Sequence, residues 1–293
     1  MIQRVTSTTM MQASMRNLQS ATAQLARAQE RASGFQAITR PSDDPAATAA
    51  AIGVRGAQRA NAQYARNIQD GNGWLSTIDS ALDSTTKLLQ RARDLTLQGA
   101  NDGAMSPTQK EAIAAEIESI RDLLLAQSNT SYLGRSVFAG TSDAGHAFAA
   151  DYSFTGGLGS VERRIDDGTT VRVDVDGSEV FGTGAASAFA TLDRIAADLR
   201  GGGDVRANLA ALDGHREAVL RVHAGVGARH GTVLAAVDRN LGDKIGLEAA
   251  RSSLEDLDVA EVAIELSMRE VGHQAALAAT ARAVRPTLMD YLA

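Results

Sequence analysis

The chain has 293 residues, a formal net charge of −6, 44% hydrophobic residues and only 4% aromatic residues. The length allows about two or three domains, while the acidic balance argues against nucleic acid, which is normally bound by a basic patch. The absence of cysteine excludes disulfides and thiolate ligands. No stretch reaches the roughly 18 apolar residues of a membrane span, so we expect no membrane partner.

Residues 1–40 carry a repeat that is typical of a thin coiled-coil seam. Met11, Leu18 and Leu25 recur every seven residues, and the small residues Ser14 and Ala21 fall between them. A narrow face on which large and small side chains alternate predicts a helix that packs against one partner helix.

A non-helical turn is expected after this helix. Pro41, Asp43, Asp44 and Pro45 lie close together, and a proline disfavours helix in the residue that precedes it. The two aspartates can bond to nearby amides or cap the helix that follows. We therefore expect a hinge that sets the angle between the terminal coil and the rest of the chain.

Residues 46–100 predict one long helix, because apolar side chains recur at alternating spacings of three and four. Gly71 and Gly73 weaken the case for an unbroken rod, since glycine is a poor helix former.

A second helix is expected to begin at Pro107, where Ser106 and Gln109 complete a capping box. The short link before it should make this helix fold back antiparallel to the first long one.

The middle of the chain changes character between residues 130 and 185. Glycine becomes frequent, and apolar residues alternate with polar ones at 161–165 and 171–175. Asp167-Gly168 and Asp176-Gly177 supply turn residues. This pattern predicts a small antiparallel β insertion.

Helical spacing returns at about 187–199 and, after a triple glycine, continues through 205–237. Asp258 is placed to cap a last helix, with Glu261 three positions on. The simplest packing sets the two ends of the chain side by side, so we expect the first stripe to face an apolar stripe of the last helix. The predicted assembly seam consists of Met11, Leu18, Leu25, Leu257, Ile264, Met268, Val271, Leu288 and Leu292.

The predicted fold class is mainly α, an elongated antiparallel helical bundle with terminal coiled-coil segments and a small central β insertion. Three domains are expected. They are a terminal coiled coil (1–45 plus 255–293), a long-helix bundle (46–141 plus 200–254) and an outer β-rich insertion with a helix (142–199).

No pattern of catalytic or cofactor-binding residues is apparent, so we expect no enzyme and no cofactor. His223 and His230 are seven residues apart but have no cysteine or HExxH context to support a metal site. Paired acids and glycine clusters lack the spacing of a phosphate loop or the partner groups of a catalytic site. The positive signals concern assembly, which leaves a structural subunit or a coiled-coil binding module such as a sensor or adhesin stalk.

Five segments resemble the flagellin family and its hook-associated junction relatives, in the same order along the chain. They are Ile-Thr-Arg-Pro-Ser-Asp-Asp-Pro-Ala-Ala at 38–47 (after Ser33-Gly34), Leu-Leu-Gln-Arg-Ala-Arg-Asp-Leu at 88–95, Tyr-Leu-Gly-Arg-Ser-Val-Phe-Ala-Gly-Thr at 132–141, Val-Gly-Ala-Arg at 226–229 and Ser-Ser-Leu-Glu-Asp-Leu-Asp-Val-Ala-Glu at 252–261. Filament flagellin usually has a Lys-Asp-Asp-Ala run where this chain has 40–45, and it tends to end in a different tail. Both departures resemble the junction relatives.

The resemblance implies a structural subunit of the bacterial flagellum that joins hook to filament by helical self-assembly, with filament flagellin itself as the alternative. It implies an extracellular place at the hook-filament junction, reached by flagellar type III export without a cleaved signal peptide. The implied partners are further copies of the chain in a ring, flagellin, a hook-side junction protein and an export chaperone on the C-terminal region.

Overall fold

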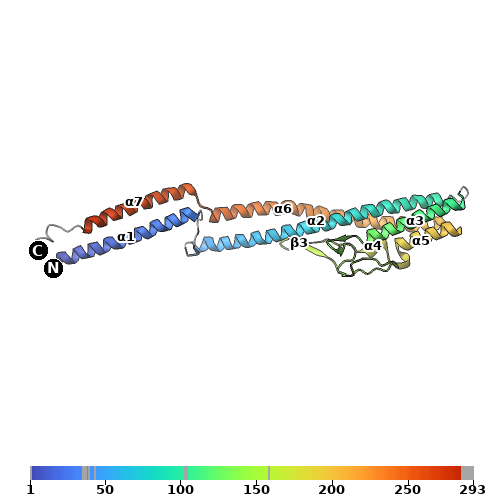
Figure 1. Ribbon diagram of the computed structural model, residues 1–293, viewed down its shortest axis with the longest axis horizontal. Coiled ribbons are helices and arrows are strands. Elements are labelled where there is room, and N and C mark those ends of the chain that lie inside the picture. Colours follow the sequence, from blue (N-terminus) through green and yellow to red (C-terminus); the bar gives the residue numbers. More distant parts are fainter. Residues whose placement is uncertain are drawn as a thin grey trace. The chain divides into compact units, whose positions relative to one another are not determined.

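The computed structural model of the chain is dominated by helices (Figure 1). The residues that the structure describes are 2–34, 38, 40–42, 44–101, 105–157 and 159–284. Among them the helices are α1 (Ile2–Gly34), α2 (Pro45–Gly99), α3 (Pro107–Ser128), α4 (Gly177–Phe181), α5 (Ala188–Gly201), α6 (Leu209–Glu255) and α7 (Val259–Val284), with short 3₁₀ turns at Gly184–Ala186 and Val205–Asn208. The mainly α fold with a small β insertion is confirmed.

The chain divides into two compact units. Unit 1 combines Met1–Arg59 with Lys244–Ala293, and unit 2 is Ala60–Asp243. In unit 1, α1 lies alongside α7, so the two ends of the chain pair as predicted. The division into three domains stays a prediction.

The long second helix is confirmed, because α2 runs from Pro45 to Gly99. Asp44 caps its start: the Asp44 Oδ1 atom accepts a hydrogen bond from the Ala47 amide at 2.9 Å, as expected for an N-cap aspartate. Asp43 and the ends of the predicted seam, Leu288 and Leu292, lie outside the described residues.

The expected weakness at the two α2 glycines is wrong, because the helix continues through both. A side chain is absent at these two positions because the insertion packs directly against the helix there. A Cβ at Gly73 would come within 2.4 Å of the Tyr132 hydroxyl, and one at Gly71 within 3.3 Å of the Val173 side chain. The packing of the insertion therefore explains residues that helix propensity alone disfavours.

Helix α3 begins as its capping box predicts. The Ser106 side chain accepts from the Gln109 amide, and the Gln109 side chain accepts from the Ser106 amide. Helix α3 packs along α5, and Arg200 of α5 reaches two carboxylates of α3. Its guanidinium bonds to Glu111 at 2.8 Å and to Glu118 at 2.5 Å. These bonds hold the pKa of each carboxyl below its usual value.

Two small antiparallel sheets form the β insertion. Strands β1 (Ser131–Tyr132) and β2 (Arg135–Ser136) make a tight hairpin, and β3 (Glu162–Asp166) pairs with β4 (Thr169–Arg172). The turn at Asp167-Gly168 is confirmed by its place between β3 and β4 and by the positive φ of 82° at Gly168.

The expected turn at Asp176-Gly177 is wrong. Asp176 caps the short helix α4 instead, and its side chain accepts from the Ser178 amide at 2.8 Å. An Asp-Gly pair suits a helix N-cap as well as a hairpin turn, so the local sequence could not separate the two.

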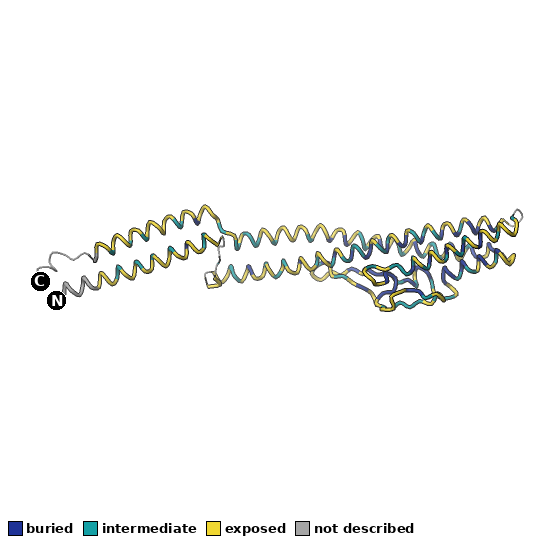
Figure 2. Tube along the Cα trace, in the orientation of Figure 1, coloured by how far each residue is buried: buried dark blue, intermediate teal, exposed yellow. Residues whose placement is uncertain are grey.

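The thickest part of the core lies in unit 2. Figure 2 shows buried residues concentrated along α2, α3, α5 and the insertion. Four phenylalanines form its centre, and Phe181 and Phe189 stack with ring centroids 5.7 Å apart. The four are Phe138, Phe148, Phe181 and Phe189, and each is at most 1% exposed.

The second half of the chain follows the predicted breaks. Ser187 caps α5, Gly202 ends it in the left-handed conformation, and Asp204 caps the 3₁₀ turn before α6. Asp258 accepts from the amides of Ala260 and Glu261 at the start of α7.

None of the described helices combines the length and apolar character that crossing a membrane would require.

Candidate assembly surface

Helices α1 and α7 of unit 1 pack antiparallel along a thin seam. On α1 the inner line consists of half-buried Ser14, Leu18, Ala21 and Leu25 and the buried Ala28. On α7 it consists of buried Val262 and half-buried Leu266, His273, Ala276 and Thr280. The α1 line repeats at spacings of four and three, and the α7 line at spacings of four, seven, three and four, which fits the seam of a two-stranded coiled coil.

Polar contacts on the flanks fix how α7 is rotated against α1. Arg31 donates to both carboxylate oxygens of Glu265 at 2.9 Å. Arg269 donates to the Gln24 amide oxygen at 2.6 Å. The Thr280 hydroxyl donates to the Ser14 carbonyl at 3.4 Å. These bonds run from one end of the pair to the other, so they hold a single register.

The predicted facing of the two stripes is wrong within one chain. Ile264, Met268 and Val271 are 62%, 64% and 65% exposed and lie on the side of α7 away from α1. Helix α7 is apolar on both sides, so periodicity alone could not choose the inner one. The polar partners of α1 decide it, because they meet Glu265 and Arg269 only when the Val262 line faces inward.

Some of the other predicted seam residues lie on the inner line and others do not. Leu18 and Leu25 lie on the inner line of α1, while Met11 is 36% exposed and Leu257 is half-buried before α7. Several large apolar side chains of the two helices are exposed among the described residues. They are Met10 and Met15 on α1 and Val259, Ile264, Met268, Val271 and Leu277 on α7. We call Ile264, Met268 and Val271 the outer stripe.

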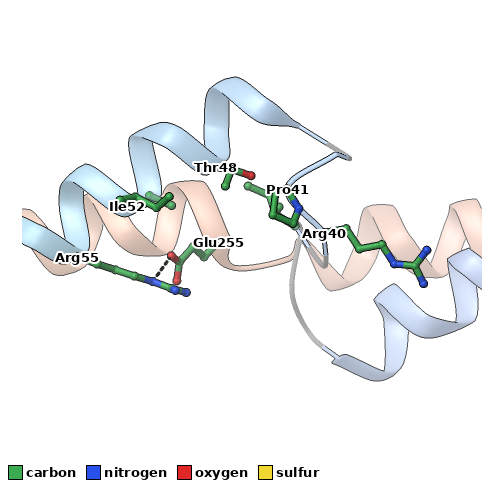
Figure 3. Close-up of a pocket in the computed structure, with 8 residues that line it drawn as sticks. Arg40, Pro41, Thr48, Ile52, Arg55 and Glu255 are labelled. Atoms are coloured by element: carbon green, nitrogen blue, oxygen red, sulfur yellow. Dashed lines mark ion pairs between the residues drawn. The ribbon is translucent and has the colours of Figure 1, made fainter.

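The connector between α1 and α2 borders a pocket of about 240 Å³ (Figure 3). Its apolar walls come from Ile38, Pro41, Ala51 and Ile52, and its polar rim from Arg40, Thr48, Arg55 and Glu255. Arg55 Nε lies 2.8 Å from Glu255 Oε1 across the start of α2 and the end of α6. The buried Thr48 hydroxyl has no hydrogen-bond partner among the described residues.

A second polar link joins the same two helix ends. Gln58 of α2 donates to Glu248 of α6 at 2.9 Å, and a hydrogen bond from Arg251 lowers the pKa of Glu248. Of the predicted hinge, Pro41 lines the pocket and Asp44 caps α2. The role of residues 41–45 as a hinge stays a prediction.

The histidines of α6 make packing contacts with neighbouring helices. His223 Nε2 lies 2.8 Å from an Asp79 oxygen, and His230 Nε2 lies 2.8 Å from the Asn72 amide oxygen. Among the described residues, no three His, Asp or Glu side chains gather closely enough to hold a metal ion.

Arg229, which was noted in the sequence only as part of a motif, makes a hydrogen bond between α6 and the insertion. It donates to the Asp174 carbonyl at 2.9 Å and so ties α6 to the insertion. Burial lowers the pKa of Arg229. The inner line of α7 was not predicted from the sequence, although Val262, Leu266, His273, Ala276 and Thr280 recur on one side of the helix.

Comparison with known proteins shows what the chain is similar to. Residues 5–143 match the model of the bacterial flagellin N-terminal helical region. The resemblance to the flagellin family is confirmed. The matched residues include α1 from residue 5 onward, the whole of α2 and α3, and the β1–β2 hairpin.

Individual relatives extend the resemblance. Flagellar hook-associated protein 3 of Escherichia coli K12 is 27% identical over 191 residues, which are 64% of this chain and 60% of that protein. The chain therefore spans less than two thirds of the length of this curated relative. Flagellin of Bacillus subtilis 168 is 26% identical over 271 residues, 87% of either protein. A solved structure of a putative flagellar hook-associated protein from Vibrio parahaemolyticus has the same fold, with a TM-score of 0.67 at 24% identity over 73% of this chain and 100% of that one.

Proposed function

We propose that this chain is a structural subunit of the bacterial flagellum that joins hook to filament by helical self-assembly. The observation that carries the proposal is the outer stripe of α7, which leaves three large apolar side chains 62–65% exposed on a helix whose other side is already paired. Burying each such side chain contributes about 1.5–3 kcal/mol. A thin helix pair with an uncovered apolar side is suited to ordered packing against further copies.

The resemblance supplies the rest of the proposal. The chain is exported by the flagellar type III apparatus without a cleaved signal peptide, and it takes its place outside the cell at the hook-filament junction. Its partners there are further copies in a ring, a hook-side junction protein and flagellin, and a chaperone covers its C-terminal region before export. Its role is structural rather than catalytic.

Filament flagellin is the second candidate, and one observation favours it. The Bacillus subtilis flagellin aligns over 87% of both chains, a wider span than the hook-associated relative from Escherichia coli. The departures at residues 40–45 and the hook-associated structures of the same fold favour the junction role.

Immunogold labelling separates the two roles. The full-length chain is expressed from its own gene in cells that lack the chromosomal copy, and flagella are labelled with an antibody against the insertion. We expect one narrow band of gold between hook and filament, together with loss of filaments in cells without the gene. Gold along the whole filament would establish a flagellin, and unlabelled flagella on motile cells would overturn both roles.

A further inference from the structure

Helix α7 has a second regular line of side chains, on the side away from α1, that carries a charge at each end. The line begins at Glu261, continues through the outer stripe, Ala275 and Ala278, and ends at Arg282. Its residues recur at alternating spacings of three and four, which is the repeat of a coiled-coil seam. Every member is exposed, so this charged-end line has no partner among the described residues of the single chain.

The side chains of the charged-end line change from large to small along α7. The outer stripe occupies the half nearer the start of the helix, whereas Ala275 and Ala278 occupy the other half. An antiparallel pairing of two copies about Val271 places Ile264 of one copy opposite Ala278 of the other. The same pairing places Met268 opposite Ala275. Large side chains then meet small ones along the whole contact, which is how facing helices interdigitate without voids.

The two terminal charges match in the same arrangement. Glu261 of one copy faces Arg282 of the other, and this happens at both ends of the contact. Neither side chain has an ion-pair partner among the residues that the structure describes. The other charged residues of α7 do not compete, because Glu265 and Arg269 bond to α1 and Glu270 belongs to neither apolar line.

A parallel pairing of the same two lines in register fits neither the charges nor the sizes. It sets the two Glu261 carboxylates against each other and the two Arg282 guanidinium groups against each other, and like charges repel. It also brings the two Ile264 side chains together at one end and the two Ala278 side chains together at the other, so the helices could not keep one spacing. Size and charge therefore select the antiparallel arrangement independently of each other.

We propose that free copies of this chain associate in pairs through the charged-end lines of α7, antiparallel about Val271. The contact is isologous, because each copy offers the same residues to the other. Copies that join a hook to a filament all point the same way along one axis, so they cannot keep an antiparallel pair of this kind. The pair therefore covers the outer stripe before assembly and separates on incorporation. That consequence rests on the proposed function, whereas the pairing itself does not.

Sedimentation equilibrium of the purified full-length chain tests the pairing, and we expect a reversible equilibrium between monomer and dimer. Glu261→Arg and Arg282→Glu each weaken association by about threefold or more, because each sets like charges opposite each other at both ends of the contact. The double variant exchanges the two charges, restores both ion pairs and returns to the association constant of wild type. Glu270→Arg changes the net charge as Glu261→Arg does, but away from the line, and it is the matched control with unchanged association.

The chain contains no cysteine, so single introduced cysteines report the register of the pair. On oxidation with copper phenanthroline, Val271→Cys is expected to form a disulfide-linked dimer, because the two copies of residue 271 face each other at the centre. Ala278→Cys is expected to stay monomeric alone and to form a mixed dimer with Ile264→Cys.

Three results overturn the inference: a chain that sediments as a monomer at every concentration, a charge exchange that does not restore association, or a dimer linked through residue 278 of both copies. Each of them leaves the proposed function standing when gold labels the junction between hook and filament. Absence of the chain from flagella overturns the proposed function and leaves the pairing in solution as it was measured.

Discussion

The α1–α7 pair and the core of unit 2 are both largely helical but are stabilised in different ways. In the described parts of α1 and α7 the buried apolar residues are Ala28 and Val262. Unit 2 buries four phenylalanines and a long row of aliphatic side chains between α2, α3, α5, α6 and the insertion. Ordering one residue costs about 1–2 kcal/mol of backbone entropy, which a thin seam offsets poorly and a thick core offsets well. We therefore expect unit 2 to fold alone, and we expect the terminal pair to gain further contacts in the proposed assembly.

The largest expected effect is in the unit 2 core. Phe189→Ala removes a ring that packs against Phe148 and Phe181, and we expect a loss of about 3–5 kcal/mol in unfolding free energy. Urea denaturation followed by circular dichroism measures it. The matched truncation Val262→Ala in the seam should leave the main transition unchanged, and an equal loss in both variants would erase the contrast between the regions.

A smaller effect is expected where the insertion lies on α2. Gly73→Ala places a Cβ 2.4 Å from the Tyr132 hydroxyl, and the hairpin must shift, at a cost of about 1–3 kcal/mol. The control is Gly214→Ala, which meets open space and should stabilise α6 by about 0.5–1 kcal/mol. Thermal melts of both variants show the opposite signs, and a neutral Gly73→Ala would mean that the hairpin is not held against α2.

The smallest expected effect is a pH dependence confined to the α3–α5 contact. Hydrogen bonds from Arg200 lower the pKa of Glu111 and Glu118 in the folded chain. A carboxyl whose pKa is lower in the folded than in the unfolded chain stabilises the fold at pH values above its unfolded pKa of about 4.3. That stabilisation is lost as the pH falls through the pKa of the folded chain. Arg200→Gln should therefore be less stable than wild type at pH 7 and equal to it well below pH 4. A difference in melting temperature between Arg200→Gln and wild type that stays constant from pH 7 to below pH 4 would contradict this role of Glu111 and Glu118. The stability of the α1–α7 pair should be the same in the variant and in wild type.

Local chemistry made much of the fold predictable. The capping box of Ser106 and Gln109, the aspartate cap of α2 and the glycine break after α5 each satisfy backbone groups within a few residues, so the sequence alone locates them. The continuity of α2 through Gly71 and Gly73 was not predictable, because its cause lies some 60 to 100 residues away in Tyr132 and Val173.

The candidate surface was predictable in its residues but not in its orientation. Ile264, Met268 and Val271 stand out as an apolar line, yet the Val262 line has the same period on the opposite side. Which one faces α1 depends on long-range bonds such as Arg31 with Glu265, separated by 234 residues. Helical periodicity contains no such information, since it describes one helix at a time.

From the proposed function we expect the outer stripe of α7 to drive assembly and to contribute little to the fold of the single chain. Ile264→Asp places a charge at a 62% exposed position, where it costs little in the monomer but would be desolvated without a partner in an assembly. Gln274→Asp puts the same charge on an exposed side of the same helix away from the stripe, and it should behave as wild type.

The decisive experiment measures two properties of one preparation of Ile264→Asp: its thermal melting curve and its incorporation into hook-filament junctions. We expect an unchanged melt, intact helicity and loss of incorporation, with normal incorporation of Gln274→Asp. An early melt with lost helicity would show that the stripe belongs to the fold of the monomer, and normal incorporation with an unchanged melt would show that the stripe has no part in assembly.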